Sequence, residues 1–173
     1  ARRWLGLSLA LVCGAALGWA IDPNRTMSQY VRDKWGQESG FPAGPVYAIH
    51  QTPDGYLWIG TEKGLVRFDG LHFRLMASEN VEIPALTHVL GLTSDPEGSL
   101  WVRLRRPTLL RYQNGSFDEA MRRLGRPRAT VSAMARARDG SLLLWVLEGE
   151  GRAIVLRGDR FQTLAAPVGF SRS

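Results

Sequence analysis

The sequence predicts an all-β protein, and two observations support that prediction. Residues 46–76 divide into four short segments rich in β-branched and aromatic residues, separated by turn signals such as Asp69-Gly70. The unit then recurs twice, because the acidic residue that opens its first turn reappears after 43 and then 42 residues, as Asp54, Glu97 and Asp139. A four-stranded antiparallel unit repeated at this period is typical of a β-propeller blade.

The repeated residues have structural roles in such a blade. Acidic residues and glycines suit tight turns, tryptophans supply apolar area for packing between blades, and Gly60 permits close backbone approach. Residues 56–59 and 142–146 are apolar throughout, which predicts strands packed on both faces. In the third repeat the tryptophan is shifted along the strand. The expected structural repeat motif is Asp54, Gly55, Trp58, Gly60, Thr61, Gly64, Asp69, Gly70, Trp101, Asp139, Gly140 and Trp145.

The chain begins with features of a secretory signal peptide. Arg2 and Arg3 precede an apolar run over residues 4–20, which ends with the small residues Gly18 and Ala20. We therefore expect a signal-peptide helix over residues 1–20, with an uncleaved anchor helix as the alternative. Cys13 is the one cysteine of the chain, so the mature protein would contain no disulfide.

The remaining residues divide by the repeat. Residues 21–45 form a lead-in, in which residues 30–35 could be a ring-closing strand or could simply cover the edge of the first blade. Residues 46–85 form the first blade, residues 86–128 the second, and residues 129–173 the third together with the start of another. About three blades make an incomplete ring, so we expect further blades in a longer protein, or else association of several chains.

Charge and motifs narrow the classes of function. The net charge of +6 comes mostly from arginine, and ten arginines lie between Arg103 and Arg138. An anionic partner would explain them, but a solvated arginine-rich surface is the favoured interpretation, and no nucleic acid partner is expected. The sequence contains no catalytic, nucleotide-binding or dinucleotide-binding motif. His50, His72 and His88 are widely separated, and the turn acids lack calcium-loop spacing, so no catalytic, cofactor or metal residue is assigned.

The first repeat resembles a known family. Tyr-Leu-Trp-Ile-Gly-Thr at residues 56–61, then Gly64-Leu65 and Arg67-Phe68-Asp69-Gly70, is similar to the repeat of the two-component regulator propeller family. Gly40-Phe41-Pro42 also resembles the lead into such a repeat. The second and third repeats are more divergent. The resemblance implies a secreted propeller that acts as the sensor of a bacterial membrane receptor, followed by a transmembrane helix and a histidine kinase or diguanylate cyclase.

The expected function is therefore an extracytoplasmic, periplasmic sensor of a two-component receptor in the inner membrane, without enzymatic activity in this stretch. Its partners would be an unknown ligand or periplasmic protein, the remaining blades and the kinase region, and in some cases a second copy in a homodimer. The alternatives are a secreted propeller enzyme of lyase or glycosidase type and a non-enzymatic scaffold. Weak candidates for ligand contact, where the sequence departs from the repeat, are Arg103, Arg105 and Arg106.

Overall fold

The computed structural model describes residue 26 and residues 33–42, 44–77, 86–106, 108–148, 150–158 and 160–164. The chain divides into two compact units, Ala1–Lys34 and Trp35–Ser173, and every described strand lies in the second. The expected signal peptide, its cleavage site and the start of a fourth blade fall outside the described residues.

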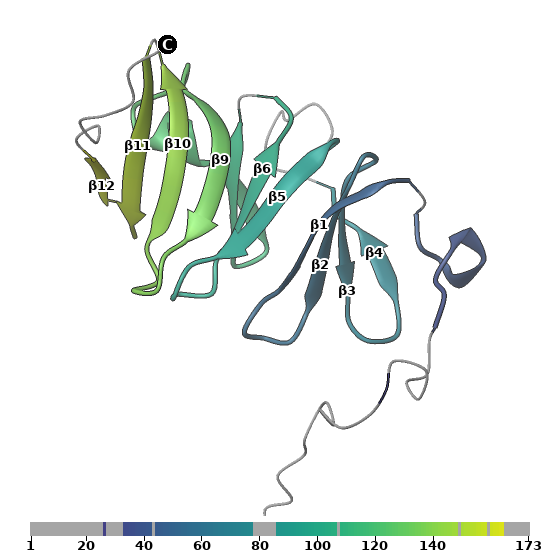
Figure 1. Ribbon diagram of the computed structural model, residues 1–173. Coiled ribbons are helices and arrows are strands. Elements are labelled where there is room, and N and C mark those ends of the chain that lie inside the picture. Colours follow the sequence, from purple (N-terminus) through teal and green to yellow (C-terminus); the bar gives the residue numbers. More distant parts are fainter. Residues whose placement is uncertain are drawn as a thin grey trace, which may run out of the picture. The chain divides into compact units, whose positions relative to one another are not determined.

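The described residues of the second unit form three four-stranded antiparallel sheets, and in each sheet the strands are arranged in chain order (Figure 1). The first sheet holds β1 (Val46–Gln51), β2 (Leu57–Thr61), β3 (Leu65–Phe68) and β4 (Phe73–Leu75). The second holds β5 (Val89–Ser94), β6 (Leu100–Leu104), β7 (Leu109–Gln113) and β8 (Ser116–Glu119). The third holds β9 (Thr130–Arg136), β10 (Leu142–Glu148), β11 (Glu150–Arg157) and β12 (Arg160–Thr163). The helices among the described residues are the short η2 (Gln37–Ser39) and α1 (Ala120–Arg123). The all-β prediction of three propeller blades is confirmed.

The turn between the first two strands of each blade repeats in its backbone hydrogen bonds. In the first blade the Thr52 N–H donates to the Tyr56 carbonyl, and the Gly55 N–H donates to the Thr52 carbonyl. Asp95 and Ala137 make the same two backbone bonds in the second and third blades. Thr52, Asp95 and Ala137 are therefore structurally equivalent, although their side chains differ.

Successive blades pack through two apolar cores. One core joins the first and second blades through Trp58 and Leu65 on one side and Leu100, Val102 and Leu110 on the other. The next joins the second and third blades, with Trp101 facing Leu142, Leu144 and Val146. The first strands of the blades are also in contact, β1 with β5 and β5 with β9. The middle blade is thus buried on both faces.

The third blade departs from the prediction of strands packed on both faces. Along β10, Leu142, Leu144 and Val146 are 1–2% exposed, whereas Leu143, Trp145 and Leu147 are 38–45% exposed. Side chains alternate across a strand, so one face of β10 packs on the second blade while the other lies at the surface of the described residues. An apolar strand is consistent with burial on both faces, but within the described structure only one face is covered.

Trp35 and Phe41, at the described end of the lead-in, pack against the first blade by aromatic contacts. The ring of Trp35 lies 5.4 Å from that of Phe68 and 5.9 Å from that of Phe73, and Phe41 lies 5.3 Å from Phe73. Residues 33–35, the described part of the expected ring-closing strand, form no strand. Trp35 therefore covers the side chains of β3 and β4 and does not extend their hydrogen-bonded ladder.

Two glycines of the first blade are explained by close packing. A Cβ on Gly60 would lie 2.7 Å from the Cγ1 atom and 2.8 Å from the carbonyl oxygen of Val89 in β5. Gly64 has φ +156°, and its N–H donates to the Thr61 hydroxyl at 3.0 Å while that hydroxyl donates to the Gly64 carbonyl at 2.9 Å. The Gly-Thr pair and the following glycine thus join the first two blades and close the turn between β2 and β3.

Candidate functional site

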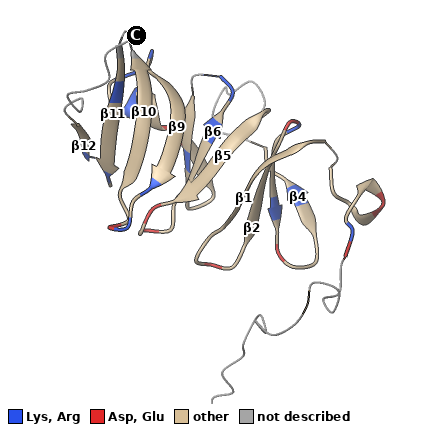
Figure 2. Cartoon of the chain, in the orientation of Figure 1, with Lys and Arg blue, Asp and Glu red and all other residues tan. Residues whose placement is uncertain are grey.

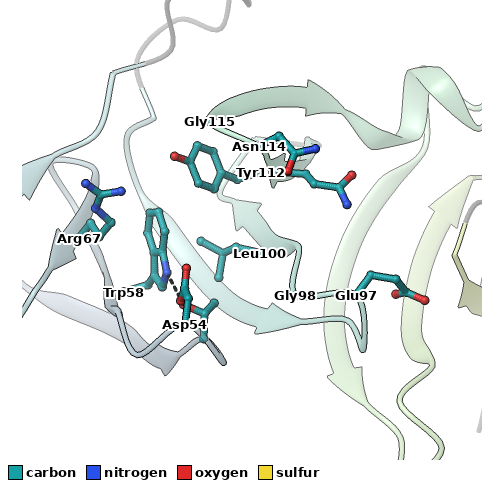
Figure 3. Close-up of a pocket in the computed structure, with 11 residues that line it drawn as sticks. Asp54, Trp58, Arg67, Glu97, Gly98, Leu100, Tyr112, Asn114 and Gly115 are labelled. Carbon is teal, nitrogen blue, oxygen red and sulfur yellow. Dashed lines mark hydrogen bonds between the residues drawn. The ribbon is translucent and has the colours of Figure 1, made fainter.

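A cavity of about 300 Å³ lies between the first and second blades. On the first blade its wall comes from the turn after β1 and from β2 and β3; on the second it comes from the turn before β6 and the hairpin after β7. Figure 3 shows Asp54, Trp58 and Arg67 on one wall, with Tyr112 and Leu100 on the facing wall. The other lining residues are Thr52, Glu97, Gly98, Gln113, Asn114 and Gly115.

A hydrogen-bond relay shapes the floor of this cavity. The indole N–H of Trp58, which is buried, donates to the Thr52 hydroxyl at 2.9 Å. That hydroxyl donates to a carboxylate oxygen of Asp54 at 2.5 Å. A buried indole N–H needs an acceptor, so Thr52 is both the partner of the tryptophan and the group that holds Asp54 at the cavity.

The guanidinium of Arg67 lies on the opposite side of Trp58. Arg67 and Trp58 are cross-strand partners, and the guanidinium carbon lies 4.4 Å from the centre of the Tyr56 ring. Tyr112 contacts the edge of Trp58 with ring centres 5.2 Å apart. The site therefore presents a carboxylate, a guanidinium and a half-buried tyrosine around one cavity, which is a suitable arrangement for binding a small polar molecule.

A smaller cavity of about 170 Å³ occupies the corresponding position between the second and third blades. Here the carboxylate of Asp139 accepts hydrogen bonds from the Ser141 N–H and hydroxyl and from Arg157, the last at 2.9 Å. The Ser141 hydroxyl and Arg157 hold the pKa of Asp139 far below its ordinary value. At this second cavity Asp139 and Arg157 thus already pair with each other, whereas no ion pair joins Asp54 and Arg67 at the first cavity in the described structure.

The arginines singled out in the sequence lie elsewhere. Arg105 and Arg106 are exposed in the turn between β6 and β7, at the end of the blade opposite the turns that line both cavities. Arg103 is half-buried and donates to the Leu90 carbonyl at 3.4 Å, and burial lowers its pKa. Figure 2 shows acidic residues at the turns after β1 and β5, and both basic and acidic residues at the turn after β9. None of the three arginines lines either cavity.

The structural repeat motif is distributed as follows. Asp54, Gly55, Asp69, Gly70, Asp139 and Gly140 lie in turns, and Asp69 accepts the N–H groups of Leu71 and His72, which lowers its pKa. Trp58 and Trp101 are buried between blades. Trp145 differs, because it lies two residues further along its strand, at the place of Gly60, and is 45% exposed.

Sequence reasoning missed a link between the first two blades. His50 Nε2 lies 2.9 Å from the Ser94 hydroxyl, and this contact joins the C-terminal ends of β1 and β5. Burial lowers the pKa of His50, and the charge of Arg136 in β9 lowers it further. A histidine in a strand with no spacing motif gave no signal for this contact. Among the described residues, no group of three or more histidine, cysteine, aspartate or glutamate side chains could hold a metal.

Comparison with known proteins agrees with this architecture. Residues 40–63 match the family model described as Two component regulator propeller. That segment covers the approach to the first blade and its first two strands, so the chain carries a two-component regulator propeller repeat, as the sequence resemblance indicated. No curated protein matches the chain.

Several solved structures share the fold. The extracellular domain of the proposed hybrid two-component system BT3049 from B. thetaiotaomicron aligns with a TM-score of 0.57 at 21% identity, over 75% of this chain and 19% of that one. The extracellular domain of the proposed one-component system BT4673 from the same organism aligns with a TM-score of 0.53 at 21% identity, over 72% of this chain and 17% of that one. Virginiamycin B lyase from Staphylococcus aureus aligns with a TM-score of 0.54 at 16% identity, over 70% of this chain and 41% of that one.

At such identities the likeness shows the propeller fold alone. The chain spans about a fifth of the length of the two extracellular domains that it matches. In the part of the chain that the structure describes, no helix has both the length and the apolar character needed to span a membrane.

Proposed function

We propose that this chain is part of the extracytoplasmic sensor propeller of a membrane-bound two-component receptor, and that the cavity between its first two blades binds the signal. The observation that carries the proposal is the match of residues 40–63 to a two-component regulator propeller repeat. The extracellular domains with the same fold are consistent with this role. The chain itself would be non-enzymatic, with a histidine kinase or diguanylate cyclase output in another part of the protein.

The cavity adds a physical route for signalling. Its walls belong to two different blades, so a bound molecule would contact both at once. A ligand shifts a conformational equilibrium only when it binds one state better than the other. A molecule that bridges the two blades would favour the blade packing in which both walls can contact it. That change in blade packing would alter the rest of the receptor or its contact with a second copy in a dimer.

Two measurements test the proposal. Residues 1–173 fused to a bacterial alkaline phosphatase, which is active only after export, should give active phosphatase; the same fusion lacking residues 1–20 should not. Membranes containing the intact protein should incorporate phosphate from labelled ATP onto histidine, or make a cyclic dinucleotide from GTP. Inactive phosphatase in the first fusion, or neither output in the membranes, would overturn the sensor proposal.

The competing proposals predict different results. A secreted lyase or glycosidase, which could share the fold of virginiamycin B lyase, predicts cleavage of substrate by the purified protein without nucleotide chemistry. A scaffold predicts export with neither activity.

A further inference from the structure

Three equivalent positions carry the same side chains in the first two blades except at one, which is residue 52 in the first blade and residue 95 in the second. In the second blade the indole N–H of Trp101 donates to the Asp95 carboxylate at 2.9 Å, and Arg111 Nη2 lies 3.6 Å from the same carboxylate oxygen. In the first blade, Trp58 donates to residue 52, and its cross-strand partner is again an arginine. Residue 52, however, is threonine. The first blade therefore retains the tryptophan and the arginine but has lost the carboxylate between them.

This loss leaves a guanidinium at a cavity. Within the part of the chain that the structure describes, Arg67 forms no ion pair with a carboxylate, although its side chain lines the first cavity. Arg111, which is 7% exposed and lies beside Asp95, lines neither cavity. A ligand carboxylate beside Arg67 would supply the negative charge that Asp95 supplies in the second blade, and a guanidinium can bind a carboxylate through two parallel hydrogen bonds.

The same cavity carries a negative charge at a separate place. Asp54 is held there by the Thr52 hydroxyl, and no ion pair joins Asp54 to Arg67 in the described structure. Figure 3 shows Asp54 and Arg67 on either side of Trp58, whereas the carboxylate of Glu97 is directed away from them. On the facing wall, Tyr112 offers a half-buried aromatic ring, whereas Leu100 is 1% exposed and belongs to the core between the blades.

These observations define a ligand class. A simple anion would be repelled by Asp54 and a simple cation by Arg67, whereas a small zwitterion would satisfy both charges. We propose that the cavity between the first and second blades binds a free L-α-amino acid, with its carboxylate on Arg67, its ammonium on Asp54 and its side chain toward Tyr112. This inference rests on the proposed function in that it names the ligand class of the same cavity.

The test starts from the ligands. The intact purified protein is titrated calorimetrically with each of the twenty standard L-α-amino acids, and then with the N-acetyl and the carboxamide derivatives of the best binder. We expect at least one amino acid to bind with a Kd below about 1 mM, and each derivative, which lacks one of the two charges, to bind at least tenfold more weakly. Binding that survives removal of either charge would overturn the inference, as would the absence of binding by all twenty.

Variants then locate the site. Arg67→Gln and Asp54→Asn should each weaken binding at least tenfold. Arg106→Gln, which removes the same charge at the other end of the blades, should leave it within twofold. The most specific change is Thr52→Asp, which restores the carboxylate present at Asp95. It should pair with Arg67 and weaken binding at least tenfold without lowering the melting temperature. Unchanged affinity in Arg67→Gln and Thr52→Asp would place the ligand elsewhere and overturn the inference.

This experiment is independent of signalling. If no amino acid binds but the phosphatase fusion is exported and the membranes label with phosphate, the ligand class is wrong and the sensor proposal stands. If an amino acid binds at Arg67 but no output is found, the site stands and the receptor role fails.

Discussion

The indole nitrogen of Trp101 donates a 2.9 Å hydrogen bond to the carboxylate of Asp95, six residues earlier in the chain. Asp95 is buried, and its second oxygen accepts the Ser99 N–H at 2.8 Å. The carboxylate thus joins the turn before β6, the tryptophan in β6 and Arg111 in β7. Its removal would leave the Ser99 N–H and the Trp101 indole N–H without this acceptor.

Asp95→Ala should therefore be strongly destabilising. We expect it to lower the free energy of unfolding by about 2–4 kcal/mol, because a buried donor and a buried cation lose an ionised acceptor. Thr52→Ala, at the equivalent place in the first blade, removes only a neutral hydroxyl and should cost about 1 kcal/mol. Urea unfolding of the two variants checks which one loses more free energy of unfolding. Equal losses in the two variants would contradict this account of the two turns.

The third blade suggests a compensating change. At the positions of Asp95, Trp101 and Arg111 it has Ala137, Leu143 and Val155, so the carboxylate, indole and guanidinium are all replaced by apolar side chains. Asp95→Ala combined with Arg111→Val should be less destabilising than Asp95→Ala alone by about 1–2 kcal/mol, because the double variant also removes the buried guanidinium that has lost the Asp95 carboxylate. A double-mutant cycle measures the coupling energy between the two residues. Purely additive losses in the free energy of unfolding would show that the contribution of Arg111 to stability does not depend on Asp95.

Gly60 should not accept a side chain. Its missing Cβ would lie 2.8 Å from a backbone oxygen of β5, which cannot move without disturbing the contact between blades. We expect Gly60→Ala to cost about 1–3 kcal/mol through overpacking. Trp145 occupies the same strand position in the third blade and is 45% exposed, so Trp145→Ala should cost less. Thermal unfolding compares the two; a larger loss for Trp145→Ala would show that its exposed face is covered in solution.

The pair formed by His50 and Ser94 should make stability depend on pH. The pKa of His50 is lowered in the folded protein by burial and by Arg136, so the unfolded chain takes up the proton first as the pH falls. The contribution of His50 is fully present above its unfolded pKa of about 6.5, and is lost as the pH falls through its lower folded pKa.

Melting temperatures between pH 8 and pH 5 test this expectation. The natural protein should lose stability below about pH 6.5, and His50→Gln should remove part of that loss because the amide does not titrate. An unchanged pH profile in the variant would show that His50 is not protonated preferentially in the unfolded chain.

The sequence by itself determined the repeating unit and its turns. The acidic residue, the glycine and the apolar strand after them are local signals, because turn geometry and strand pairing depend on residues close in the chain. The four strands of each blade, the Thr61–Gly64 turn and the buried positions of Trp58 and Trp101 could all be anticipated in this way. The family resemblance came from the same local residues.

Only the tertiary structure decided which residues surround the candidate site. Arg67 and Tyr112 lie 45 positions apart and belong to different blades, so no spacing in the sequence brings them to one cavity. Pattern reasoning chose Arg103, Arg105 and Arg106 because they depart from the repeat, yet they lie away from both cavities. The significance of Thr52 at the position equivalent to Asp95 is also visible only in the fold. There the tryptophan and the arginine that surround Asp95 in the second blade have counterparts around Thr52 in the first.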